Sequence, residues 1–113
     1  MGDLSQWGKS SMRKRTSKRV PVQLPVTFAG DLIDDGEGTV VNLSPEGCAI
    51  GCNSSPQRGN TIHLTVYLGD QELPMTVELA NVRWRMEEVF GVQFISMSPE
   101  QQERLRRFIN LFT

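Results

Sequence analysis

The chain has 113 residues, a length that suits one domain with a single hydrophobic core. Hydrophobic residues make up 38% of it and fall in short runs. None of these runs approaches the ~20 consecutive apolar residues that a membrane-spanning helix needs. No signal peptide is visible, because the first apolar run of sufficient length follows a basic segment and is interrupted by Pro21 and Pro25. These features predict a cytoplasmic protein without membrane insertion.

The formal net charge of −1 conceals an uneven distribution of charge along the chain. Residues 1–19 carry six Lys or Arg side chains against one acid, a balance of +5. Residues 20–113 carry six against twelve, a balance of −6. A basic segment on an acidic body indicates that an anionic partner binds locally at that segment. Proteins that bind duplex nucleic acid need a broad basic face, and the body lacks one, so nucleic acid is not the expected partner.

The first strand is expected at residues 20–28. Residues 1–12 have no clear period, and we expect them to form a flexible segment. From Val20 to Phe28, apolar residues alternate with polar or small ones, which is the period of a half-buried strand. Two prolines within this strand cannot donate ladder hydrogen bonds, so the strand is expected to have a free edge along part of its length. An acidic, glycine-rich loop is expected at residues 29–38.

Six further short runs have the pattern of strands. They cover residues 39–43, 48–52, 62–68, 73–79, 82–86 and 90–94. The fourth and fifth of the seven expected strands flank a Gly-Asp turn, which predicts a hairpin. Many short strands of this kind predict an all-β fold, a small antiparallel β-barrel of six to seven strands.

A helix is expected after the last strand, at about residues 99–112. Ser98 is a capping residue, Pro99 suits the first helical position, and Gln101 stands three residues after the cap. Apolar residues then recur at helical spacing, which predicts an amphipathic helix that covers one opening of the barrel. The solvated face of this helix is expected to carry Arg104, Arg106 and Arg107.

Catalytic and metal-binding groups are sparse in this sequence. Cys48 and Cys52 share one face of an extended strand and are interpreted as buried, small hydrophobic residues. Two cysteines and one histidine cannot supply the four ligands of a structural zinc site. The single histidine, His63, alternates with polar residues and is expected at the surface. Because phosphate-binding glycine loops are also absent, we expect no enzyme activity, no metal and no cofactor.

Residues 13–19, the basic arm, form the first of two motifs that could bind a ligand. The arm reads Arg-Lys-Arg-Thr-Ser-Lys-Arg and ends where the first strand begins. Guanidinium groups match phosphate and the Hoogsteen edge of guanine, and they also stack on bases. Arg15 and Arg19 are four residues apart, so a compact ligand could be held by both. The alternative is a solubilising tail or one that attracts nucleic acid.

The second motif is Asn-Leu-Ser-Pro-Glu-Gly at residues 42–47. Asn42 and Ser44 have short side chains that bond to nearby backbone and shape tight turns. Gly47 permits a positive φ angle or the close approach of another chain. This segment could be no more than a connection between strands. Alternatively, it is a polar shelf whose Asn and Ser face a ligand.

Together, in this order and spacing, the two motifs resemble the signature of the PilZ family, bacterial receptors for cyclic di-GMP. The matching residues are Arg15-Thr16-Ser17-Lys18-Arg19 and Asn42-Leu43-Ser44-Pro45-Glu46-Gly47. The resemblance covers residues 13–113, which include the basic arm and the closing helix. It implies that Arg15 and Arg19 hold phosphates and guanine edges. It also implies that Asn42 and Ser44 bond a guanine, while Gly47 lets the base lie close to the backbone.

The resemblance further implies a stoichiometry and a signalling role. In the family, the residue before the first motif arginine influences whether one ligand or a stacked pair binds. Here that residue is Lys14, which favours a stacked pair of cyclic di-GMP molecules, and Arg13 is a further candidate contact. Trp84 could stack on a base, although its place in the alternation of residues 82–86 favours the core. The implied function is a receptor or adaptor that orders its basic arm and changes the surface offered to an unidentified partner protein.

Two other functions compete with this one. A small barrel could bind single-stranded nucleic acid, but that function needs aromatic residues across a basic groove, and the body's charge of −6 opposes it. A PilZ-like protein-interaction module without a ligand is the second alternative. The intact motif residues argue against it; they are Arg15, Arg19, Asn42, Ser44 and Gly47.

Overall fold

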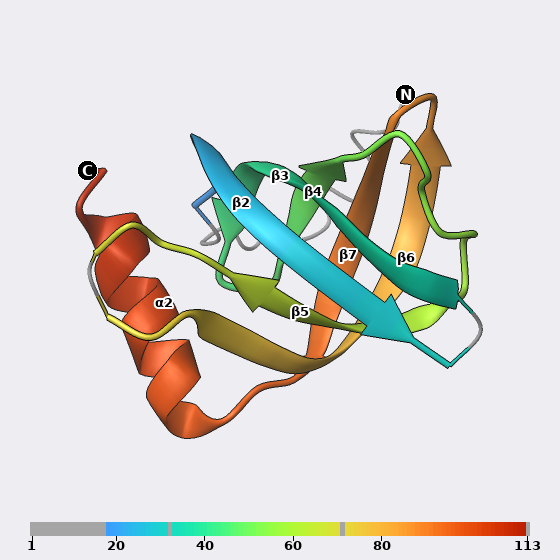
Figure 1. Ribbon diagram of the computed structural model, residues 1–113. Helices are drawn as coiled ribbons and strands as arrows, with labels where there is room; N and C mark the ends of the chain where they lie inside the picture. The colour runs from blue at the N-terminus through green and yellow to red at the C-terminus, as the bar shows by residue number, and fades with distance from the viewer. Residues whose placement is uncertain (1–17, 32, 71, 113) are drawn as a thin grey trace, which may run out of the picture.

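The computed structural model describes residues 18–112 except residues 32 and 71. These residues form a closed antiparallel barrel with the strand order β2-β3-β4-β7-β6-β5 and a C-terminal helix (Figure 1). The elements are β2 (Val20–Gly30), β3 (Ile33–Ser44), β4 (Gly47–Gly51), β5 (Thr61–Val66), β6 (Met75–Met86), β7 (Val89–Ser96) and α2 (Pro99–Asn110). The all-β barrel with a closing helix is therefore confirmed.

The β6 strand is continuous where the sequence indicated two strands, at residues 73–79 and 82–86. Its first part pairs with β5 and its second part with β7, and Ala80 pairs with both neighbours. The register shifts between Leu79 and Ala80 and again between Val82 and Trp84. Bulges of this kind bend a long strand and allow it to follow the curve of a closed barrel. The irregularities that suggested a break between two strands are therefore bends within one.

Residues 29–38 are not the loop that their composition predicted. β2 continues to Gly30, β3 begins at Ile33, and the two strands pair through Phe28 opposite Gly36. A Cβ at Gly36 would lie 2.6 Å from two atoms of the Phe28 ring. Glycine is therefore needed in this strand because an aromatic ring packs on the backbone. Among the described residues, β5 pairs with β2 only over 26–29, which agrees with the partly free edge expected of β2.

The barrel interior holds the alternating apolar residues. Phe28 and Phe90 are both buried there and meet edge to face, with ring centroids 5.4 Å apart. Cys48 is buried among them, as expected, whereas Cys52 is only half-buried, and both thiols are free. His63 is exposed, in agreement with its polar pattern.

Helix α2 lies across one end of the barrel (Figure 1). Ser98 caps it by accepting a hydrogen bond from the backbone N–H of Gln101, and Leu105 and Ile109 reach the core. Arg104 is not on the solvated face, where it was expected. Its side chain is 11% exposed, and Nη2 donates to both carboxylate oxygens of Asp70, at 2.9 and 3.2 Å. This ion pair fastens the helix to the β5–β6 connection. Within the described part of the chain, no helix has the length and apolar character needed to cross a membrane.

Candidate ligand-binding site

The register of β2 and β3 brings the two sequence motifs together. Arg19 directly precedes β2, and Pro21 pairs with Asn42 on β3. Arg19 Nη1 donates a hydrogen bond of 2.5 Å to Asn42 Oδ1. The last residue of the basic arm therefore contacts the first residue of the Asn-x-Ser-x-x-Gly motif. The other arm residues proposed as contacts, Arg13, Lys14 and Arg15, lie outside the described residues.

The remaining motif residues shape the turn between β3 and β4. Ser44 is 2% exposed; its Oγ donates to the carbonyl of Gly47 at 3.2 Å and accepts from the N–H of Glu46 at 3.3 Å. Gly47 does not have a positive φ angle. A Cβ there would instead overlap the carbonyl oxygen of Val92 on β7. Glycine is thus required because the β7 backbone approaches closely, and a contact between Ser44 and a ligand stays a prediction.

A row of paired residues crosses four strands beside this turn. Asn42 on β3 pairs with Ala49 on β4, Ala49 with Gly91 on β7, and Gly91 with Trp84 on β6. The two central residues, Ala49 and Gly91, are small, so the sheet surface is indented between the larger side chains of Asn42 and Trp84. The indole of Trp84 occupies the space over Gly91, where a Cβ would overlap it.

Trp84 lies outside the core, contrary to what the alternation of residues 82–86 favoured. It is 40% exposed, whereas Val82 is buried. The register shift between these two residues inverts the alternation, so Trp84 does not share the inner face with Val82, and residues 83–86 are all exposed. This bulge makes the indole available at the surface, where an aromatic face can stack on a base.

A cavity of about 660 Å³, the ligand cavity, lies over this row. Its lining includes three residues that the sequence did not single out as site residues: Glu46, Arg83 and Gln93. Arg83 adjoins Trp84, but strict alternation would have placed the two on opposite faces of the sheet. The complete lining consists of Arg19, Asn42, Glu46, Gly47, Cys48, Arg83, Trp84, Gly91, Val92 and Gln93.

The charges of the ligand cavity suit an anion with polar edges. Two guanidinium groups, Arg19 and Arg83, line it against one carboxylate, Glu46. Beneath them, burial raises the pKa of the Cys48 thiol from 9.0 to about 12, and the nearby Arg19 opposes the shift only in part. The thiol is therefore protonated near neutral pH and is a packing group rather than a nucleophile. Among the described residues, no three His, Cys, Asp or Glu side chains are grouped so that they could hold a metal ion.

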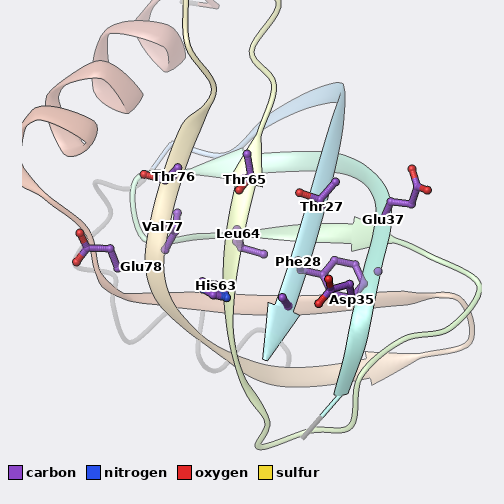
Figure 2. A pocket seen from close by; sticks show the side chains of 12 residues that line it. Thr27, Phe28, Asp35, Glu37, His63, Leu64, Thr65, Thr76, Val77 and Glu78 are labelled. Atoms are coloured by element: carbon purple, nitrogen blue, oxygen red, sulfur yellow. The ribbon is translucent and has the colours of Figure 1, made fainter. Parts of the chain in front are cut away.

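A second concave surface, of about 510 Å³, has the opposite character (Figure 2). It lies on the outer face of β2, β3, β5 and β6, where Thr27, Thr65 and Thr76 pair in a row. Its lining includes three acidic residues and no Lys or Arg; the acids are Asp35, Glu37 and Glu78. An anionic ligand would meet repulsion on this surface, so the ligand cavity is the better candidate site.

Solved structures of similar fold include three proteins in which less than a fifth of the aligned residues are identical to those of this chain. The Bacillus subtilis inhibitor of motility, MotI/DgrA, has 19% identity and a TM-score of 0.73 over 88% of this chain. This chain spans 51% of that protein's length. The PilZ domain of CeSA from a cellulose-synthesizing bacterium has 17% identity and a TM-score of 0.65, covering 84% of this chain and 97% of that one.

The third structure is the PilZ domain of YcgR from Escherichia coli, solved with c-di-GMP. It has 14% identity and a TM-score of 0.69, covering 87% of this chain and 90% of that one. These identities support the fold alone, and no curated protein sequence matches this chain. The family model described as the PilZ domain, however, matches residues 13–111, from the basic arm to the end of the closing helix. The chain therefore belongs to the PilZ domain family.

Proposed function

We propose that this protein is a receptor for cyclic di-GMP and holds the ligand in the ligand cavity. The observation that carries the proposal is the meeting of Arg19 and Asn42 at one wall of a cavity whose other wall is Trp84. The ligand has two phosphates and two guanine bases, so it needs cations, donors and acceptors for base edges, and a stacking face. Family membership supports this assignment, since the PilZ domain of YcgR was solved with c-di-GMP.

Each motif residue has a proposed task in binding. Arg15 and Arg19 hold phosphates and guanine edges, because a guanidinium matches both kinds of acceptor. Asn42 bonds a guanine with an amide that both donates and accepts. Trp84 stacks on a base. Ser44 and Gly47 shape the β3–β4 turn that lies beside the bound ligand. Lys14 and Arg13 would add positive charge for a second, stacked ligand molecule.

The output of the receptor is a change in the position of the basic arm. We propose that ligand phosphates neutralise the arm's cations and order it across the barrel beside Asn42. A partner protein would then meet a different surface in the bound form, and no catalytic step is needed. NMR relaxation of residues 13–17 in free and saturated protein tests this. Residues that are equally rigid, or equally mobile, in both forms would show that the arm is not the switch.

Calorimetric titration with cyclic di-GMP tests the proposed function, and cyclic di-AMP is the matched control ligand. Adenine presents an amino donor where guanine presents the O6 acceptor, so an arginine fork would face a donor. We expect binding of cyclic di-GMP and far weaker binding of cyclic di-AMP and of GMP. Equal affinities for the two cyclic dinucleotides, or no binding of either, would refute a guanine-reading receptor.

A further inference from the structure

Arg83 lines the ligand cavity together with Trp84, its neighbour in β6. It is an exposed arginine, and within the described residues it forms no ion pair. Its Nη1 instead donates a hydrogen bond of 2.7 Å to Oε1 of Gln93. It lies outside both sequence motifs, so neither the arm nor the turn accounts for it.

Gln93 is itself held by the barrel. It lies on β7 and pairs with Gly47 of β4 on one side and with Asn81 of β6 on the other. Because its amide oxygen accepts from Arg83, Gln93 fixes one edge of the guanidinium plane and leaves most of its N–H donors for a ligand. An exposed arginine without such a partner would lose more side-chain entropy on binding. Arg83 is therefore pre-oriented at the wall of the cavity.

We infer that Arg83 reads the Hoogsteen edge of the guanine that stacks on Trp84, with Gln93 as its positioning residue. The two residues are adjacent in the bulge of β6 and line the same cavity, so a base lying on the indole presents an edge to the neighbouring guanidinium. O6 and N7 of guanine accept the two parallel N–H bonds of an arginine fork, whereas adenine opposes one of them with a donor. The inference rests on the proposed function and deepens it, making Arg83 a determinant of base specificity.

The chain offers a matched control for this inference. Arg85 is also an exposed arginine of β6, two residues further along, and it does not line the ligand cavity. Arg83→Ala and Arg85→Ala therefore remove the same charge from the same strand. Arg83→Lys keeps the charge and removes the fork. Thermal unfolding of each variant verifies that the fold is retained.

Calorimetry with cyclic di-GMP and cyclic di-AMP gives the deciding comparison. We expect Arg83→Ala to lower the affinity for cyclic di-GMP by about ten- to hundredfold, while Arg85→Ala leaves it unchanged. In Arg83→Ala the affinity for cyclic di-AMP should fall much less, so the preference for cyclic di-GMP, measured as the ratio of the two affinities, becomes smaller. We expect Arg83→Lys to lose about as much affinity for cyclic di-GMP as Arg83→Ala, because lysine keeps the charge but has no fork. Gln93→Ala weakens binding in the wild-type background but has no further effect in the Arg83→Ala background, a result that a general structural role would not produce.

Three results would overturn the inference. The first is equal affinity of the Arg83→Ala and Arg85→Ala variants, which would reduce the role of Arg83 to general electrostatics. The second is an equal loss for both dinucleotides, which would assign Arg83 to a phosphate. The third is full binding by Arg83→Lys, which would exclude a fork. In all three cases the wild-type protein still binds cyclic di-GMP. Failure of the wild-type protein to bind would instead refute the proposed function itself.

Discussion

The indole of Trp84 occupies the space that a side chain at residue 91 would need. The two residues pair across β6 and β7, and a Cβ at Gly91 would overlap the indole atoms Cε2 and Nε1. The position of the proposed stacking face therefore depends on this glycine. We expect Gly91→Ala to displace the indole and to weaken cyclic di-GMP binding about as much as Trp84→Ala. Base–aromatic stacking is worth about 1–3 kcal/mol per base, roughly a five- to hundredfold loss in affinity.

Calorimetry measures the affinity, and tryptophan fluorescence in a Trp7→Phe background reports the displacement of the indole. Gly51→Ala is the matched control, because a Cβ at Gly51 would meet its nearest atoms at 3.9 Å, an ordinary contact. Full affinity of Gly91→Ala together with a clear loss in Trp84→Ala would mean that the ring binds the ligand from another position.

The hydrogen bond between Arg19 and Asn42 predicts coupled effects on binding. We expect Arg19→Ala and Asn42→Ala each to reduce the affinity for cyclic di-GMP by about ten- to hundredfold, because bonds to a charged group are worth roughly 1.5–3 kcal/mol. The double variant should lose less than the sum of the two, since the residues contact each other. Arg107→Ala is the control, because Arg107 is an exposed arginine on α2 and does not line the ligand cavity. Equal losses in all three single variants would indicate diffuse attraction rather than a site.

Gly47 is expected to matter for stability as well as for binding. Gly47→Ala would force a Cβ against the Val92 carbonyl of the neighbouring strand, a backbone group that cannot turn aside. Overpacking of this kind costs roughly 1–3 kcal/mol, and each kcal/mol lowers Tm by roughly 4–8 °C in a small domain. Thermal unfolding measures the change, with Gly51→Ala on the same strand as the control. Equal Tm values for the two variants would show that β7 moves aside to make room.

Cys48 predicts a loss of stability in alkaline solution. Burial raises its pKa from 9.0 to about 12, so between these values the unfolded chain releases the thiol proton while the folded protein keeps it. The stabilising contribution is complete below pH 9.0 and declines as the pH rises towards 12, by at most ~1.4 kcal/mol per pH unit. Urea unfolding of wild-type and Cys48→Ala proteins across this range isolates the effect. Parallel pH profiles would show that the thiol ionises as readily in the folded protein.

Much of the fold followed from local pattern. The alternation from Val20 to Phe28 and the cap at Ser98 predicted a strand and a helix, because each depends on residues close together in the chain. The two motifs indicated a candidate site in the same way, and ligand binding there stays a prediction. The prediction was wrong at Gly36. Its glycine-rich surroundings suggested a loop, but Gly36 lies in β3, where the absence of a side chain makes room for the Phe28 ring. Such a contact depends on a residue of the neighbouring strand, which the local pattern does not include.

The barrel, the closing helix and two motifs expected to bind an anion could all be predicted from the amino-acid sequence. The residues that lie opposite those motifs could be identified only once the strands were paired in the barrel. The β6 bulge turned Trp84 outward beside Arg83, and the pairing of β6 with β7 placed both beside Gly91 and Gln93. The packing of α2 against the barrel likewise brought Arg104 to Asp70 and away from solvent. A bulge changes the face of every residue after it until the next irregularity, and no local periodicity reveals where the ladder will shift.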